Sequence, residues 1–131
     1  MYWNKEIETI DRAGLQRIQL ERLKKALEAG ATTPFYKKVF AEHGVAPAKI
    51  TSVEHIRDIP FTTKNDLRVS YPDGMIAVPK RSIVRMHASS GTTGKPTVIF
   101  YTMRDVDEWA HQVARGMVAT GTTADDVFQN M

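Results

Sequence analysis

The chain has 131 residues, 42% of them hydrophobic and 25% charged, and its formal net charge is +3. This length suffices for one domain with a core but not for two large ones, and the composition is typical of soluble globular proteins. The lysine pairs at 24–25 and 37–38 are too short to form a nucleic-acid-binding face. The absence of cysteine excludes disulfides, cysteine-ligated zinc and a thiolate nucleophile.

The sequence carries no signal for secretion or membrane insertion. Charged residues follow soon after Met1, and no apolar run approaches the ~18 residues needed to span a bilayer. We therefore expect a cytoplasmic protein that binds neither membrane nor nucleic acid.

Helix signals dominate the first half of the chain. Asp11 is a candidate N-cap, and leucine and isoleucine then recur at mostly helical spacing as far as Gly30. Thr33 and Pro34 combine a capping hydroxyl with a proline in the first turn, and Gly44 ends this second helix. We predict two helices between these residues.

The region that follows is predicted to be more broken. Residues 52–58 form a short piece, and a capping box that begins at Thr63 predicts a helix through about Val69. A strong turn signal at residues 71–74 closes this part. Residues 1–74 are therefore expected to be a mainly helical region.

Residues 75–131 change to a strand pattern. Residues 82–87 alternate in polarity and are rich in branched side chains, and residues 96–101 form a second such run. The stretch 88–95 between them is then a hairpin-like loop. The predicted fold class is α/β, a helical N-terminal half followed by a β-hairpin and the start of a larger sheet.

A further helix with a regular apolar face is predicted after Thr102, with Trp109 and Met117 in the core and Gly121 at its end. Residues 127–131 look like the opening of a third strand. An unpaired strand leaves backbone groups unsatisfied, so the chain is expected to be truncated at its C-terminus. The exposed sheet edge and apolar surface leave self-association, for example as a homodimer, open.

The hairpin loop contains the residue types that bind phosphate. Glycines let the backbone approach an oxyanion closely, and successive N–H groups can form an anion-binding concavity. Hydroxyls add hydrogen-bond donors, and a lysine adds positive charge. The predicted binding positions are Ser89, Ser90, Gly91, Thr92, Thr93, Gly94 and Lys95. No catalytic residue and no metal ligand is assigned.

Two other interpretations of the loop compete with this one. A Walker A loop needs a longer spacing between its glycines, a Ser or Thr after the lysine, and a helix behind it. Here Gly91 and Gly94 are too close, Pro96 follows Lys95, and a predicted strand comes next, so this class is disfavoured. An ordinary polar hairpin loop stays open on composition alone, because Ser, Thr and Gly are common in turns.

Residues 89–97 resemble the signature of the adenylate-forming enzymes, which include acyl-CoA synthetases, luciferases and the adenylation domains of peptide synthetases. The flanking motifs are similar to those of the phenylacetate–CoA ligase family, and the resemblance runs through essentially the whole chain. These motifs are Tyr2-Trp3, Thr33-Pro34-Phe35-Tyr36, Ile59-Pro60-Phe61-Thr62-Thr63-Lys64-Asn65-Asp66-Leu67-Arg68 and His87-Ala88.

The resemblance implies a two-step reaction. The carboxylate of an aryl acid such as phenylacetate attacks ATP, accompanied by Mg²⁺, to give an acyl-adenylate and pyrophosphate. Coenzyme A then displaces AMP to give the thioester. The loop would hold the β- and γ-phosphates, which is positioning and electrostatic stabilisation and not covalent catalysis.

The resemblance also implies what this chain does not carry. The family's adenine and metal segment, its ribose-binding aspartate and its C-terminal adenylation lysine have no counterpart within 131 residues. Residues 1–131 would be the N-terminal part of the large adenylate-forming domain. We therefore expect an N-terminal fragment of a ligase, inactive on its own.

Two residues outside the loop, and the function of the chain itself, have more than one interpretation. Lys64 is interpreted as a solvated or capping-region lysine, with a role toward substrate or phosphate as the alternative. His87 is interpreted as a hydrogen-bonded structural histidine, because the other histidines form no ligand spacing with it. The alternative function is a non-catalytic helical interaction module in which the loop is incidental.

Overall fold

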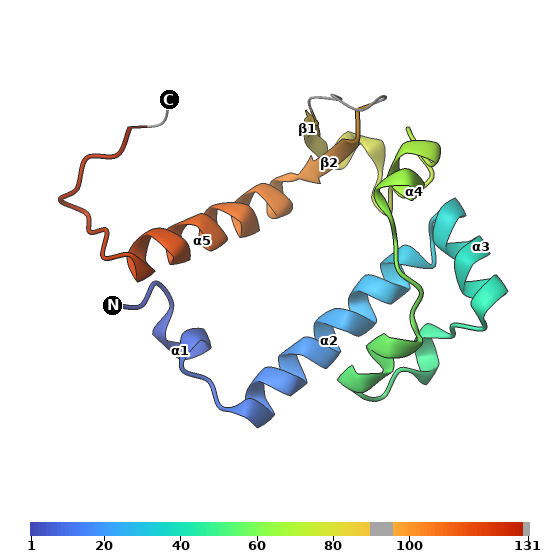
Figure 1. The fold of residues 1–131 in the computed structure, drawn as a ribbon, viewed down its shortest axis with the longest axis horizontal. Helices are drawn as coiled ribbons and strands as arrows, with labels where there is room; N and C mark the ends of the chain where they lie inside the picture. Colours follow the sequence, from blue (N-terminus) through green and yellow to red (C-terminus); the bar gives the residue numbers. More distant parts are fainter. Residues whose placement is uncertain (90–95, 130–131) are drawn as a thin grey trace.

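The computed structural model describes residues 1–89 and 96–129 (Figure 1). It is a mixed α/β structure, in which a helical part precedes a two-stranded antiparallel sheet and one long helix. The elements in chain order are α1 (Lys5–Glu8), α2 (Arg12–Gly30), α3 (Pro34–His43), the 3₁₀ turns η1 (Pro47–Lys49) and η2 (Val53–Asp58), α4 (Lys64–Val69), the 3₁₀ turn η3 (Lys80–Ser82), β1 (Ile83–Ala88), β2 (Val98–Thr102) and α5 (Met103–Ala119).

Helices α2 and α3 begin and end where the sequence predicts, whereas the short helix α1 was not predicted. The Asp11 carboxylate accepts a hydrogen bond from the Gly14 N–H at 2.7 Å, which satisfies one of the free donors of the first turn of α2. The Thr33 hydroxyl accepts from the Tyr36 N–H at the start of α3. At the other end of α3, Gly44 has a φ of 66°, a left-handed conformation that costs glycine little.

The buried core lies in this helical part. Leu27 of α2, Phe40 of α3 and Ile50 after η1 are its buried apolar residues. Burial of such side chains is the main favourable term in folding. The partly buried residues packed against them are Leu20, Leu23, Ala31, Tyr36, Val39, Val45 and Ile59.

The predicted β-hairpin is confirmed. β1 and β2 pair antiparallel, with Met86 opposite Phe100 and Ala88 opposite Val98. The register shifts near the start of β1, between Ile83 and Arg85, as a β-bulge does. The pairing brings the C-terminal end of β1 and the N-terminal end of β2 together.

Helix α5 begins where the sequence predicts, but two of its residues that were predicted to lie in the core are not buried. Thr102 and Asp105 form a capping box, in which the Asp105 carboxylate accepts from the Thr102 N–H at 2.8 Å. Trp109, predicted to be core, is 44% exposed, and Met117 is only partly buried. The periodicity identified an apolar face correctly, but α5 packs on the hairpin and extends away from it (Figure 1).

The N-terminus is anchored on α5. The Trp3 Nε1–H donates to His111 Nδ1 at 3.1 Å, and Figure 1 shows the N-terminus beside the far end of the helix. Residues 127–129, predicted to open a third strand, are neither helix nor strand, and the rest of the predicted strand lies outside the described residues. A strand needs a partner for its backbone groups, and the described sheet contains β1 and β2 alone.

In the described ranges, no helix is long and apolar enough to cross a membrane.

Candidate functional site

The predicted phosphate loop lies between β1 and β2. Of its binding positions, Ser89 is described directly after β1. The others, Ser90, Gly91, Thr92, Thr93, Gly94 and Lys95, lie outside the described residues. Their binding roles therefore stay predictions. The structure describes the base of the loop, which is formed by Ser89 and Thr97.

Two hydrogen bonds join Ser89 to Thr97 at the base of the loop. The Ser89 N–H donates to the Thr97 carbonyl at 3.0 Å, and the Thr97 N–H donates to Ser89 Oγ at 2.9 Å. A serine hydroxyl accepts through its lone pairs and still has one hydrogen to donate. Ser89 therefore has a structural role at the mouth of the loop and retains a donor for a ligand.

A hollow lies against this base. It is lined from three directions, by α4, by the end of β1 and by β2. Its lining residues are Lys64, Leu67, His87, Ala88, Ser89, Thr97, Ile99 and Tyr101. Lys64, predicted to be solvated, is exposed. That it lines the same hollow as Ser89 and Thr97 does not follow from the sequence, because these residues are far apart along the chain.

A capping box holds the first turn of α4, and with it Lys64. The Asp66 carboxylate accepts hydrogen bonds from the Thr63 hydroxyl at 2.6 Å and from the Thr63 N–H at 2.7 Å. These bonds, the hydroxyl first, hold the pKa of the Asp66 carboxyl below its ordinary value. The charged form of Asp66 thus stabilises the helix start that presents Lys64.

The capping box makes a pH prediction. Because the folded pKa of Asp66 is lowered, its contribution to stability is complete above the unfolded pKa and is lost as pH falls through the folded pKa, below roughly pH 4. Thermal melts of the chain and of Asp66→Asn between neutral and acid pH test this. We expect the stability difference between the two proteins to shrink on acidification. A difference that stays constant with pH would contradict it.

His87 is held by aromatic rings. Its ring centroid lies 5.1 Å from that of Tyr101 and 5.3 Å from that of Trp109, and these two rings stack on each other. The sequence predicts a hydrogen-bonded His87, but among residues 1–89 and 96–129 no hydrogen bond to its ring is found, and the ring contacts supply its structural role instead. In the same ranges, no cluster of His, Asp or Glu is placed to hold a metal ion.

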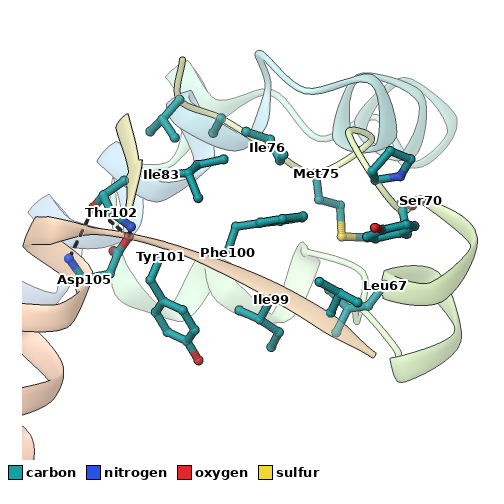
Figure 2. A pocket seen from close by; sticks show the side chains of 15 residues that line it. Leu67, Ser70, Met75, Ile76, Ile83, Ile99, Phe100, Tyr101, Thr102 and Asp105 are labelled. Atoms are coloured by element: carbon teal, nitrogen blue, oxygen red, sulfur yellow. Dashed lines mark hydrogen bonds between the residues drawn. The ribbon is translucent and has the colours of Figure 1, made fainter. Parts of the chain in front are cut away.

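A second, apolar cavity of about 320 Å³ lies on the other side of β2. Figure 2 shows Phe100 and Met75 reaching into it, whereas Ile99 and Tyr101 extend from the opposite side of the strand. The carboxylate at its margin, Asp105, is already bound in the Thr102 capping box. This cavity has the chemistry of an apolar contact surface and not of a phosphate site.

Comparison with known proteins shows relatives along nearly the whole chain. The phenylacetate–coenzyme A ligase of Pseudomonas putida is 50% identical over 116 residues, which are 88% of this chain and 26% of the relative. The enzyme of the same name from Aromatoleum evansii is 47% identical over 126 residues, 93% of this chain and 29% of the relative. No protein-family model matches the chain.

The solved structures of similar fold include those of a 2-hydroxyisobutyryl-CoA ligase. The 2-hydroxyisobutyryl-CoA ligase in its postadenylation state, in complex with 2-HIB-AMP, superposes with a TM-score of 0.84 at 28% identity, over 95% of this chain and 27% of that one. The same ligase in complex with 2-HIB-AMP and CoA gives a TM-score of 0.79 at 31% identity, over 88% and 26%. This chain thus spans about a quarter of the length of the proteins it matches.

Proposed function

We propose that this chain, whose sequence is related along nearly its whole length to phenylacetate–coenzyme A ligases, supplies the phosphate-binding part of an ATP-dependent aryl acid–CoA ligase. It would form the N-terminal part of the large adenylate-forming domain. The observation that carries the proposal is the hairpin itself, since the residues that resemble the family's phosphate loop join two paired strands whose ends are tied by Ser89 and Thr97.

The reaction proposed for the whole enzyme has two steps. A carboxylate oxygen of the acid forms a bond to the α-phosphorus of ATP while the bond to the bridging oxygen of pyrophosphate breaks. The thiol of CoA, after loss of its proton, then attacks the acyl carbon and AMP leaves. The similar 2-hydroxyisobutyryl-CoA ligase was solved with an acyl-adenylate and with CoA, which supports this sequence.

This chain would contribute to the first step, the formation of the acyl-adenylate. Negative charge gathers on the leaving pyrophosphate as the bond to the α-phosphorus breaks. Hydroxyl and N–H donors fixed on the hairpin, with the charge of Lys95, would stabilise that charge more than the ground state. Pairing of Ser89 with Thr97 fixes the loop ends before ATP binds, so less ordering is needed on binding.

Mg²⁺ would accompany the triphosphate, but the residues of the hollow at the loop base are not suited to bind Mg²⁺ themselves. Mg²⁺ takes carboxylate, phosphate or water oxygens, and the residues that line the hollow include no carboxylate. No step of the proposed mechanism therefore uses a metal held by these residues.

We also propose a cytoplasmic enzyme, because its substrates would be ATP and CoA.

The identity of the acid is tested by ATP–pyrophosphate exchange in a full-length ligase that carries this segment. We expect phenylacetate to support exchange at least ~10-fold faster than 2-hydroxyisobutyrate, because a pocket built for an aryl group gains its apolar burial only with an aryl acid. Equal rates, or a preference for the hydroxy acid, would contradict phenylacetate as the substrate.

A further inference from the structure

We propose that Trp109 of α5 is a positioning residue for the base of the hairpin loop, and that it acts through the rings of His87 and Tyr101. The inference rests on the proposed function and deepens it, because phosphate binding is assigned to the loop that this base carries. It gives a role to a tryptophan that the apolar periodicity of α5 places in the core but that the structure leaves 44% exposed.

The three rings form a closed cluster, in which each ring contacts the other two. The centroid of the Trp109 ring lies 5.3 Å from that of His87, edge-on, and 5.8 Å from that of Tyr101, with 20° between the two planes. The rings of His87 and Tyr101 are themselves 5.1 Å apart. Aromatic rings at such separations attract one another beyond the burial of their area. The cluster therefore joins β1, β2 and α5 at one point.

The backbone brings the three rings together. His87 pairs with Ile99 in the sheet, and Tyr101 lies two residues further along β2, so both rings are on the same face of the hairpin. Figure 2 shows Tyr101 on the side of β2 that faces away from the apolar cavity. Helix α5 begins at Met103, directly after β2, and side chains on a helix lean toward its N-terminus. This lean directs the indole of Trp109 back onto the hairpin.

The hairpin has no buried apolar core of its own among the described residues. The buried apolar side chains found there all belong to the helical part of the chain. A two-stranded hairpin by itself is at best marginally stable in water, so its orientation depends on contacts with other elements. His87 comes two residues before Ser89, the residue from which the loop leaves β1. The contact of Trp109 with His87 thus acts close to the base of the loop.

Positioning of this kind should affect ATP more than the acid. In the proposed mechanism the loop holds the phosphates of ATP, and a misplacement of about 1 Å can cost about 100-fold in rate. The aryl acid does not bind to the loop, so its binding should not depend on Trp109.

The role is tested by the kinetics of ATP–pyrophosphate exchange in a full-length ligase that carries this segment. We expect Trp109→Leu to raise the KM for ATP about 10-fold or more, while the KM for phenylacetate stays within about twofold of wild type. Trp109→Phe keeps a ring against His87 and should restore the KM for ATP to within about threefold. Trp3→Leu is the matched control, because it removes the ring that packs against His111, and it should leave both KM values unchanged.

A second measurement keeps Trp109 in place and so does not depend on the folding of Trp109→Leu. Coupling between two sites is reciprocal, so binding of an anion at the loop should change the surroundings of the indole. The chain has two tryptophans, and Trp3→Phe leaves only Trp109 to fluoresce. We expect tripolyphosphate, which carries the phosphates of ATP without the nucleoside, to change the emission of this variant saturably. The emission of Trp3 in Trp109→Phe should stay constant.

The outcomes separate this inference from the function on which it rests. A wild-type KM for ATP in Trp109→Leu overturns the positioning role, as does a lowered kcat with both KM values unchanged, which simple loss of folded enzyme would give. Failure of Trp109→Phe to restore the KM overturns the ring contact as its cause. Saturable shifts of the loop amides in NMR spectra on addition of tripolyphosphate, without a change in Trp109 emission, overturn the coupling and leave the proposed function intact. Absence of both signals overturns the proposed function as well.

Discussion

Replacing Gly91 by alanine or Lys95 by glutamine, in a full-length ligase that carries this segment, is expected to slow acyl-adenylate formation about 100-fold. A Cβ at position 91 would hinder close approach of the backbone to the triphosphate if the loop adopts the conformation its resemblance implies. Glutamine at position 95 removes a positive charge from the place where pyrophosphate gains negative charge. Phenylacetate-dependent ATP–pyrophosphate exchange measures this step without the contribution of CoA.

Lys49→Gln is the control for the change of net charge, because Lys49 lies in the turn η1 of the helical part. Both loop variants should keep the thermal stability of wild type, so that a slow exchange rate reports on chemistry and not on unfolding. Exchange within twofold of wild type in both variants would favour the alternative, a helical interaction module in which the loop is incidental.

The purified 131-residue chain is expected to form no detectable phenylacetyl-CoA from phenylacetate, ATP and CoA. The chain spans about a quarter of the length of the ligases that it matches. Adenylation requires both the acid and ATP to be held in a reactive geometry. A phosphate-binding site alone positions only the phosphates of ATP. Chromatographic detection of the thioester provides the measurement.

The matched control is a full-length ligase assayed at the same molar concentration. It should produce the thioester under conditions in which the chain does not. ATP-dependent thioester formation by the chain alone, at a rate above that of a boiled sample, would contradict the view that the chain lacks most of the active site.

Local chemistry explains why the helix starts could be predicted. Asp11, Thr33, Thr63 and Thr102 each accept a hydrogen bond from a backbone N–H three residues on, and this depends on few neighbours in sequence. The hairpin followed from two runs of strand-forming residues around a loop rich in glycine and hydroxyls. These features are encoded within a few residues.

Features that depend on distant partners could not be predicted. The apolar periodicity of α5 indicates a face for burial but not the surface that covers it, and Trp109 stays 44% exposed. Residues 127–129 have strand-forming side chains but no strand beside them in the described sheet. That Lys64 lines the same hollow as Ser89 and Thr97 depends on where the fold places α4 relative to the hairpin.

The central claim is that the hairpin loop binds phosphate, and backbone amide NMR of the ¹⁵N-labelled chain tests it most directly. On addition of tripolyphosphate, we predict the largest shifts at the amides of residues 89–95 and 97, because N–H groups and hydroxyls there would donate to the anion. Shifts confined to the lysine pairs at 24–25 and 37–38, or no saturable shift at all, would contradict the claim.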